Sequence, residues 1–471
     1  MMILLVLLLA ISIVYSYHNP TVNRLTKSSS SSSFSTSTSL STSLSSSSTS
    51  TSSASSLITS IDDKINAIKF HHVELYCGDA TNTYKRFMLG LGMNAIAKSD
   101  LSTGNSIYAS YALQSGHMTM LFTAPYNVSS SSLPSSSLPS SPSLTSSISS
   151  LPLPGFDCSK ASDFFIKHGL GVKTVCIEVS DVYQAYETII SNKGTSILPP
   201  QRINDNDIAK GYIDIAEVSL YGDVVLRLIN SASFKGKFLP NFNDINTALD
   251  NSYGLTRFDH IVGNLWALQP KMASLKEITG FHEFAEFVAE DVGTVDSGLN
   301  SVVLANKDES VLLPLNEPTF GTKRKSQIQT YLEQNNGEGV QHMALFTPNI
   351  FETLKKMKSA TRWGGFEFMD PQPKSYYQNI RNRIGNSLTD SQYEMIEELG
   401  LLADKDDKEG VLLQIFTKPI GDRPTLFLEI IQRIGCLNQE GNQKPGCGGF
   451  GKGNFRDLFK SIEDYEKTLN I

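Results

Sequence analysis

Two histidines and one glutamate could together hold a metal ion. His260, His342 and Glu429 each lie in a short apolar run typical of a β-strand, and the three runs are far apart in the chain. An ionised carboxylate inside an apolar strand costs free energy unless a cation or a hydrogen-bond donor pairs with it. Two neutral imidazoles and a carboxylate can cover one face of an octahedral ion, as in the facial triad of non-haem Fe(II) oxygenases.

Each of these residues also has a simpler interpretation. A single histidine in an apolar strand is more often a hydrogen-bonded core residue, and Glu429 could instead pair with Arg433 or Arg423. Zinc accepts the same residue types, although structural zinc sites are usually tetrahedral and use cysteine or more histidine. The choice in favour of a facial triad depends on a second feature of the chain, an internal repeat.

The internal repeat organises most of the chain. FHHVELYCGDATNTYKRFMLGLGM, from Phe70, resembles FDHIVGNLWALQPKMASLKEITGF, from Phe258, and each contains a strand with a histidine followed by a helix. A segment that begins at Gly171 resembles one that begins at Gly339, and VVLRLI resembles LFLEII. The two halves are therefore predicted to be duplicates.

The repeat lets the two halves be compared position by position. Only the C-terminal half carries a complete set of metal ligands, so the N-terminal half is predicted to hold no metal. The matched residues are His260 and His72, His342 and Thr174, and Glu429 and Arg227.

The coarse pattern predicts an α+β fold with three parts. Each half contains two units of a strand, a helix and further strands, which suits curved sheets with helices packed outside. We expect a leader over residues 1–57, an N-terminal domain without metal over residues 58–250, and a catalytic iron-binding domain over residues 251–471. A Ser/Pro-rich stretch, residues 129–154, is predicted to be a surface loop inserted into the N-terminal domain.

The leader has two sections. A short apolar run, MMILLVLLLAISIVYS, precedes a Ser/Thr-rich stretch without acidic residues. This order is typical of a bipartite leader that directs a protein into a plastid bounded by extra membranes, and it leaves no stable membrane span in the mature protein. The alternatives are a signal anchor or secretion with a disordered stalk, or another endomembrane or cytoplasmic location.

Charge and cysteine content exclude other classes. The net charge of -7 and the lack of a basic cluster predict no nucleic-acid partner. The 5 cysteines form no CxxC pair or regular spacing, so we predict reduced thiols. A basic run, Lys323 to Lys325, is expected to be a solvated helix start or a salt-bridge donor to a neighbouring subunit.

Long stretches resemble the plant-type 4-hydroxyphenylpyruvate dioxygenase family. They include FDHIVGN, GEGVQHMAL and DRPTLFLEIIQR around the three ligands, and PGCGGFGKGNFRDLFKSIEDYEKTL near the end of the chain. The N-terminal stretches FHHVELYCGDAT and IAEVSLYGDVVLR are similar to the same family. The resemblance spans roughly residues 60–471. It implies a duplicated vicinal-oxygen-chelate fold, with four βαβββ modules that form two open-barrel domains and with a C-terminal lid helix.

The resemblance also implies an activity. Family members use Fe(II) and O2 to convert 4-hydroxyphenylpyruvate to homogentisate and CO2, a step of tyrosine catabolism that supplies plastoquinone and tocopherol precursors, and a homodimer is expected. One alternative is a relative that makes 4-hydroxymandelate from the same substrate. The other is a metal-free binding module of the same fold.

Further site residues follow from the resemblance. Amides both donate and accept hydrogen bonds, which suits a substrate whose oxygen substituents change during turnover. The polar positions with expected catalytic roles are Ser301, Asn316, Gln327, Gln341 and Gln414. The remaining expected substrate-binding positions are Pro314, Phe416, Phe427, Phe450, Asn454 and Phe455.

The C-terminal segment is predicted to be a helix that packs and also gates the site. From Asn454 onward, apolar residues recur at helical spacing, which first indicates a packing stripe. The glycine-rich stretch CGGFGKGNF in front would let the helix close over the pocket as a lid. The apolar stripe consists of Phe455, Leu458, Phe459, Ile462 and Tyr465.

Overall fold

The computed structural model describes residues 63–126, 151–246, 251–287, 298–405, 410–437, 443–444 and 446–469. The predicted leader and most of the predicted Ser/Pro-rich loop lie outside the described residues. At the end of that loop, Leu153 is buried in an apolar cluster of the N-terminal half, so this end is not a free surface loop.

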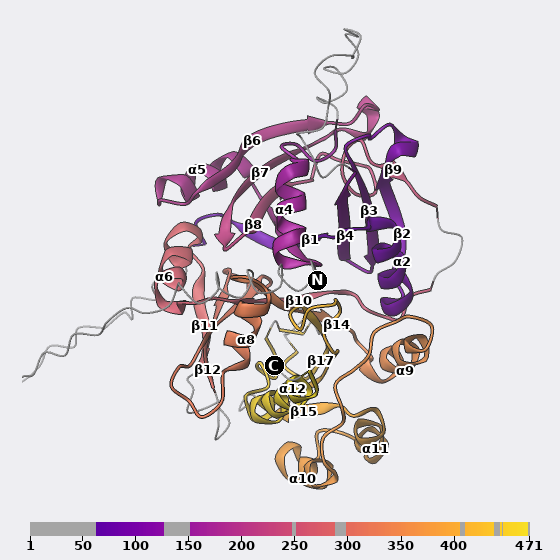
Figure 1. Cartoon of the computed structure of the whole chain (residues 1–471), viewed down its shortest axis with the longest axis vertical. Coiled ribbons are helices and arrows are strands. Elements are labelled where there is room, and N and C mark those ends of the chain that lie inside the picture. Colours follow the sequence, from indigo (N-terminus) through magenta and orange to yellow (C-terminus); the bar gives the residue numbers. More distant parts are fainter. Residues whose placement is uncertain are drawn as a thin grey trace, which may run out of the picture. The chain divides into compact units, whose positions relative to one another are not determined.

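Two modules, each a strand, a helix and three strands, form the N-terminal half (Figure 1). The first consists of β1 (Ala67–Tyr76), α2 (Ala80–Leu91), β2 (Asn94–Ser99), β3 (Tyr108–Ser115) and β4 (Met118–Pro125). The second consists of β5 (Gly171–Val179), α5 (Val182–Ser191), β6 (Ser196–Asn204), β7 (Tyr212–Tyr221) and β8 (Val224–Asn230). Additional elements are η2 (Leu101–Thr103), α4 (Cys158–His168), η3 (Ile208–Lys210) and β9 (Asn243–Asp244).

The C-terminal half repeats this order (Figure 1). Its first module consists of β10 (Arg257–Asn264), α6 (Leu268–Thr279), β11 (His282–Phe287), β12 (Leu299–Ala305) and β13 (Leu312–Pro318). Its second consists of β14 (Gly339–Phe346), α9 (Ile350–Thr361), β15 (Leu402–Lys405), β16 (Val411–Phe416) and β17 (Phe427–Ile434). Additional elements are α8 (Gln327–Gln334), α10 (Lys374–Ile384), α11 (Asp390–Leu399), η4 (Lys452–Asn454) and α12 (Phe455–Leu469).

The strand order of the two sheets confirms the predicted duplication. The N-terminal sheet runs β6-β7-β8-β5-β1-β4-β3-β2, with β9 added at its edge. The C-terminal sheet has the equivalent order β15-β16-β17-β14-β10-β13-β12-β11. In both, the first strands of the two modules pair antiparallel at the centre, β1 with β5 and β10 with β14. Residues Thr59–Ile471 form one compact unit, so the domain boundary between residues 250 and 251 stays a prediction.

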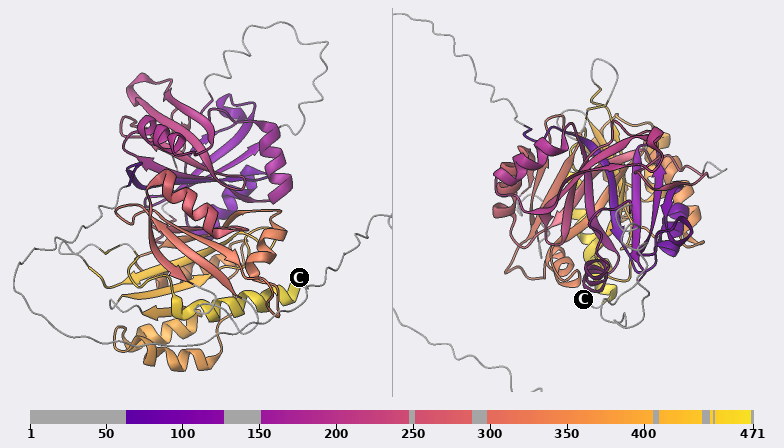
Figure 2. Two further views of the ribbon diagram at one scale, coloured as in Figure 1. Left: turned by 90° about the vertical axis from the view of Figure 1, so that its left-hand side faces the viewer. Right: turned by 90° about the horizontal axis from the view of Figure 1, so that it is seen from above.

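Polar caps start most of the module helices. The side chains of Asp79, Asp181 and Asn349 accept hydrogen bonds from the first turns of α2, α5 and α9. Such caps satisfy amide groups that the helix itself leaves without partners. Because each cap closely follows a buried strand, the chain turns sharply from the sheet onto its outer side, where the helices lie (Figure 2).

The last helix, α12, packs against the C-terminal half as an element of its own (Figure 2). Phe459 joins an apolar cluster with residues of β12, and Leu458 and Ile462 join a cluster with Phe416 and Phe427. The predicted packing stripe is therefore confirmed at these three helix positions, while the side chain of Phe455 lies outside the described residues.

Arg324 fixes α12 to the rest of the half. Its Nη2 atom lies 2.9 Å from Glu466 Oε2 and 3.0 Å from the carbonyl oxygen of Glu463. Lys325 pairs with Glu333 on α8 at 2.7 Å. The prediction that this basic run is solvated or faces a neighbouring subunit is wrong for Arg324, because two buried glutamates of its own chain face it.

One pair of cysteines departs from the predicted reduced state. Cys436 and Cys447 form a disulfide with their Cα atoms 5.8 Å apart, whereas Cys77, Cys158 and Cys176 take part in no disulfide. The chain leaves β17 and returns through a bridge between Leu437 and Gln443, which brings the two thiols together. Their spacing of 11 residues matches no motif, so the sequence did not indicate the pair.

In the part of the chain that the structure describes, no helix is long and apolar enough to cross a membrane.

Candidate active site and metal centre

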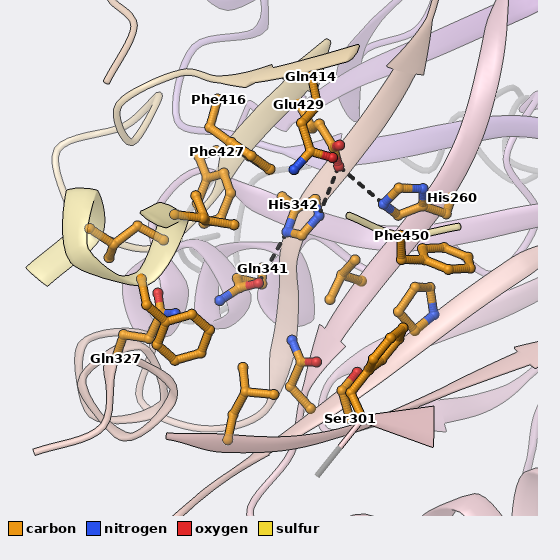
Figure 3. A pocket seen from close by; sticks show the side chains of 18 of the residues that line it. His260, Ser301, Gln327, Gln341, His342, Gln414, Phe416, Phe427, Glu429 and Phe450 are labelled. Atoms are coloured by element: carbon orange, nitrogen blue, oxygen red, sulfur yellow. Dashed lines mark hydrogen bonds and ion pairs between the residues drawn. The ribbon is translucent and has the colours of Figure 1, made fainter. Parts of the chain in front are cut away.

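The three predicted ligands meet inside the C-terminal sheet (Figure 3). Glu429 Oε2 lies 3.1 Å from His260 Nε2 and 3.4 Å from His342 Nε2. One candidate ligand atom from each residue lies within 4.8 Å of the others, and all three residues are buried. The group therefore has the residue types and the spacing to bind one cation.

Strand register explains why the three side chains converge. Ala344 on β14 pairs with His260 on β10 and with Glu429 on β17, so these two residues lie in one row across three neighbouring strands. His342 is two residues before Ala344 and shares its face, because side chains alternate along a strand. The alternation of side chains along these strands thus places all three residues on one face of the sheet.

Hydrogen bonds on the far side of each ring orient the imidazoles. His260 Nδ1 lies 2.9 Å from Asp259 Oδ1, and His342 Nδ1 lies 3.0 Å from Gln341 Oε1. Both oxygens only accept, so each ring donates from Nδ1 and presents Nε2 to Glu429. Nε2 donates to the carboxylate while the ring is protonated, and it offers a lone pair once a metal ion takes the place of that proton. Outer partners of this kind are typical of metal-binding histidines.

The charges of the group support a buried anion beside two imidazoles. Burial acts to raise the pKa of Glu429, but His260, together with hydrogen bonds from both rings, outweighs it and lowers this pKa to about 2. Burial acts to lower the pKa of His260, but Glu429 and Asp259 raise it overall. Burial lowers the pKa of His342, which Glu429 opposes.

This donor set fits a divalent metal ion. Two Nε2 atoms and one carboxylate oxygen face a common point, and the carboxylate stays ionised although it is buried. Of the residues with described positions, no cysteine or third histidine joins the group, which argues against a closed structural zinc site.

A pocket opens directly on the group, and most of the predicted substrate residues line it (Figure 3). The predicted residues in its wall are Ser301, Pro314, Asn316, Gln327, Gln341, Gln414, Phe416, Phe427 and Phe450. The pattern missed four apolar residues of the same wall, which are Val262, Phe287, Leu299 and Val303, and the predicted helix stripe adds Leu458, Phe459 and Ile462. The first four lie on the strands β10, β11 and β12, and alternation along the strand would have found Val262 from His260 and Leu299 and Val303 from Ser301.

Aromatic rings cover the imidazoles. Phe427 stacks on His342 with ring centroids 4.9 Å apart, and Phe416 meets the same ring edge-on at 5.9 Å. Phe450 meets His260 edge-on at 5.1 Å. Flat apolar walls next to the ligands suit an aromatic substrate and keep water from the metal position.

The polar residues of the pocket are only partly engaged within the protein. Asn316 donates to Asn264 Oδ1 at 3.1 Å. Gln414 Oε1 is buried and has no hydrogen-bond partner among the described residues. A buried acceptor without a partner costs free energy, so it fits a donor on a bound ligand.

Asn454 does not line this pocket, although the sequence suggested a substrate contact. Its Oδ1 atom instead lies 2.9 Å from the hydroxyl of Tyr376 and 2.9 Å from Arg383 Nη2. Asn454 ends the short helix η4, and both of its partners belong to α10 outside the pocket wall. Its oxygen therefore connects the start of α12 to α10.

Curated relatives show which family the chain belongs to. A 4-hydroxyphenylpyruvate dioxygenase from Daucus carota is 53% identical over 408 residues, which cover 85% of this chain and 88% of the relative. The Arabidopsis thaliana enzyme of the same name is 52% identical, over 86% of this chain and 90% of its own. The chain belongs to the 4-hydroxyphenylpyruvate dioxygenase family.

Solved structures agree on the fold. A 4-hydroxymandelate synthase variant from Streptomyces coelicolor aligns with a TM-score of 0.66 at 20% identity, over 85% of this chain and 99% of its own. A fusion of a xylose isomerase-like TIM barrel with a 4-hydroxyphenylpyruvate dioxygenase aligns at 0.59 and 19% identity, over 85% of this chain and 53% of its own. No family model matches the chain. The predicted duplicated vicinal-oxygen-chelate fold is thereby confirmed.

In the N-terminal half, the buried guanidinium of Arg227 stands at the position that matches Glu429. Arg227 Nη2 lies 2.8 Å from Glu74 Oε2 and 2.7 Å from Glu217 Oε1, and Arg227 Nη1 lies 3.0 Å from His72 Nε2. Arginine only donates, so His72 accepts through Nε2 and carries its proton on Nδ1.

A second group of possible metal ligands in that half fits a cation poorly. His71, His72 and Cys176 bring ligand atoms within 4.8 Å of one another. However, His72 Nδ1 lies 2.8 Å from His71 Nδ1, so both nitrogens of His72 are engaged by protein partners. A cation here would also face the guanidinium of Arg227, which repels it.

Proposed function

We propose that the chain is an Fe(II)-dependent 4-hydroxyphenylpyruvate dioxygenase, which converts 4-hydroxyphenylpyruvate and O2 to homogentisate and CO2. The observation that carries this proposal is the buried group of two Nε2 atoms and one carboxylate oxygen at the wall of an aromatic-lined pocket. Relatives that bear this name at 52% and 53% identity over most of their length support the same substrate.

His260, His342 and Glu429 would hold the iron. Bound Fe(II) supplies the position where a 2-oxo acid and dioxygen can meet and supplies electrons to dioxygen. The tautomers that Asp259 and Gln341 impose keep both Nε2 lone pairs directed at that position.

The polar side chains of the pocket would hold the substrate. Gln414 offers an acceptor that has no partner among the described residues, and a phenol hydroxyl is a donor of the kind it lacks. Ser301, Asn316, Gln327 and Gln341 would bind the remaining oxygens as neutral groups that compete little for the metal. Phe416 and Phe427 supply flat walls for the ring.

The helix α12 would exclude water from the reacting groups. Leu458, Phe459 and Ile462 contribute an apolar side of the pocket. Arg324 and the hydrogen bond of 2.7 Å from Gln372 Nε2 to Ser461 hold the helix in place. The predicted lid role remains a proposal, whereas the packing of this helix is part of the structure.

Product analysis tests the proposal. Purified protein supplied with Fe(II), 4-hydroxyphenylpyruvate and O2 should form homogentisate and CO2 in equal amounts. Formation of 4-hydroxymandelate would favour the second candidate, which the structural likeness to a 4-hydroxymandelate synthase raises at the level of the fold. Ligand binding without Fe(II)-dependent turnover would favour a binding module, although the complete set of three ligands argues against it.

Localisation and assembly are further proposals. The apolar run and the Ser/Thr-rich, acid-free stretch that follows support delivery to a plastid. Microscopy of a fusion of residues 1–57 to a fluorescent protein in the source cell tests this, and appearance of the fusion in the medium would contradict it.

A homodimer is expected from the family, and sedimentation of the purified protein would measure its oligomeric state.

A further inference from the structure

An irregularity in β10 brings an acidic residue beside the ligand His260. Pairing with β14 passes from Phe258 opposite Leu345 directly to His260 opposite Ala344, so Asp259 is an extra residue in the strand. Consecutive residues of a regular strand point to opposite faces, but a bulge can aim both side chains to one side. Asp259 Oδ1 therefore reaches His260 Nδ1, at 2.9 Å.

Arg433 binds this carboxylate with two of its nitrogens. Nε lies 2.9 Å from Asp259 Oδ2, and Nη2 lies 2.7 Å from Asp259 Oδ1. Both side chains are fully buried, and a two-pronged pair of this kind fixes a carboxylate in position and in rotation.

The third nitrogen of Arg433 binds the segment in front of α12. Nη1 donates to the carbonyl oxygens of Cys447 and Gly449, each at 2.6 Å. The next residue, Phe450, is the ring that meets His260 at 5.1 Å, and it also lies 5.5 Å from the guanidinium carbon of Arg433. One side chain thus contacts the partner of a metal ligand and the backbone that carries a wall of the pocket.

The segment has other contacts as well. The amide of Gly449 donates to the carbonyl oxygen of Gly446 at 2.9 Å, and the ring of Phe450 lies 5.7 Å from that of Phe284. Gly448, Gly449 and Gly451 have φ values of 77°, 68° and 75°, which are left-handed conformations that other residues adopt only with strain. The disulfide from Cys436 fixes only the Cys447 end. Among these contacts, Arg433 connects the segment that carries Phe450 to the partner of His260.

The N-terminal half lacks this connection although it has the same bulge. Pairing of β1 with β5 skips His71, which matches Asp259. Four residues after Arg227 stands Ser231, which matches Arg433 and donates to Glu178 at 3.1 Å. Because the fold forms without the Asp–Arg pair there, the pair is not a requirement of the module and belongs to the half with the metal ligands.

We propose that Arg433 is a positioning residue that couples the segment 446–451, and with it Phe450, to the metal ligand His260 through Asp259. The inference rests on the proposed function of the three ligands. Coupling of this kind is reciprocal: metal bound by His260 should restrain the segment, and a restrained segment should favour metal binding.

The test compares Arg433→Lys with Arg257→Gln. Arg433→Lys keeps the positive charge but loses the bidentate contact with the carboxylate of Asp259. Arg257 is a matched control, because its Nη1 atom also contacts Asp259, at 3.2 Å, from the partly exposed side of the strand. For both variants and the wild type, we would measure Fe(II) affinity anaerobically against a competing chelator, and the electron paramagnetic resonance spectrum of the Fe(II)-nitrosyl adduct. Hydrogen exchange of residues 446–451 with and without Co(II) reports on the segment.

We expect Arg433→Lys to lose about 10- to 100-fold in Fe(II) affinity and to show a changed nitrosyl spectrum. Its kcat should fall more than its KM rises, because the ligand geometry is disturbed and not the substrate contacts. Co(II) should slow exchange in the segment of the wild type and of Arg257→Gln, but not of Arg433→Lys. Arg257→Gln should stay within about threefold of the wild type in Fe(II) affinity.

Three outcomes would overturn the inference. The first is an Fe(II) affinity and spectrum of Arg433→Lys equal to the wild type, and the second is an equal loss in Arg257→Gln. The third is exchange in segment 446–451 of the wild type that does not respond to Co(II), which decides the matter even if Arg433→Lys fails to fold. A wild type that binds no iron and makes no homogentisate would instead refute the proposed function.

Discussion

The two halves of the chain have the same fold but carry side chains of opposite charge at one matched buried position. Each has a bulge before a strand histidine and an aromatic ring edge-on to that histidine. His72 and Phe238 have centroids 5.2 Å apart, and His260 and Phe450 have centroids 5.1 Å apart. At the third matched position, however, the N-terminal half has Arg227 where the C-terminal half has Glu429.

The difference shows how one fold can either fill or keep open an internal site. In the N-terminal half, Glu74 and Glu217 neutralise Arg227, so the interior already contains its cation. In the C-terminal half, Glu429 is ionised beside two imidazoles, and His260 together with hydrogen bonds from both rings compensates its charge. A bound cation fits only the second case.

The largest effect should come from removing a ligand of the C-terminal half. His260→Ala, His342→Ala and Glu429→Ala should each reduce iron content to near zero and turnover to below about a thousandth of wild type. His72→Ala is the matched control in the other half and should keep the iron content of the wild type. Metal analysis with an assay of homogentisate checks this. Loss of iron in His72→Ala would show that the metal site has been assigned to the wrong half.

A second substitution should affect stability without affecting chemistry. Arg227→Ala leaves Glu74 buried without its cation, so it should lower the free energy of unfolding by about 3–5 kcal/mol. Iron per folded chain should not change. Urea unfolding together with metal analysis measures both. An unchanged unfolding curve would show that the positive charge of Arg227 is not needed to balance the buried glutamates of this half.

The two aromatic rings allow a similar pair of substitutions. Phe238 is buried in an apolar cluster, so Phe238→Ala should cost about 3–5 kcal/mol of stability and leave kcat/KM unchanged. Phe450 lines the pocket, so Phe450→Ala should lower kcat/KM about tenfold, equivalent to about 1.4 kcal/mol in the transition state. Equal kinetic effects of both substitutions would contradict the division of roles.

The smallest effect concerns the helix that covers only the C-terminal pocket. Burial raises the pKa of Glu466 to about 7. The positive charges of Arg324 and Lys325 act to lower this pKa, whereas the negative charge of Glu463 acts to raise it. A folded pKa above the ordinary value of 4.5 means that the fold favours the protonated form. This contribution is complete below pH 4.5 and is lost as the pH rises through 7.

Glu466→Gln should therefore flatten the fall in stability between pH 5 and pH 8. Thermal unfolding of the variant and the wild type across this range measures the difference. Lys467→Gln, which removes an exposed pair with Asp464 on the same helix, is a control that should follow the wild type. Identical curves for Glu466→Gln and the wild type would show that the pKa of Glu466 is not raised in the folded protein.

The sequence predicts that the three candidate ligands converge, because alternation along a strand determines which face a residue takes. Repeat-matched positions then place His260, His342 and Glu429 together without any knowledge of loops. The bulge at Asp259 could not be predicted in this way, since it breaks that alternation. The contacts of Asn454 and the pairing of Cys436 with Cys447 depend on how irregular segments return to the sheet, which periodicity does not encode.

An anomalous difference map at the iron absorption edge, from crystals grown anaerobically with Fe(II), tests the central claim most directly. The account predicts one peak between Nε2 of His260, Nε2 of His342 and the carboxylate of Glu429, and none beside Arg227. A peak at His72 and Cys176, or no peak at the three ligands, would contradict it.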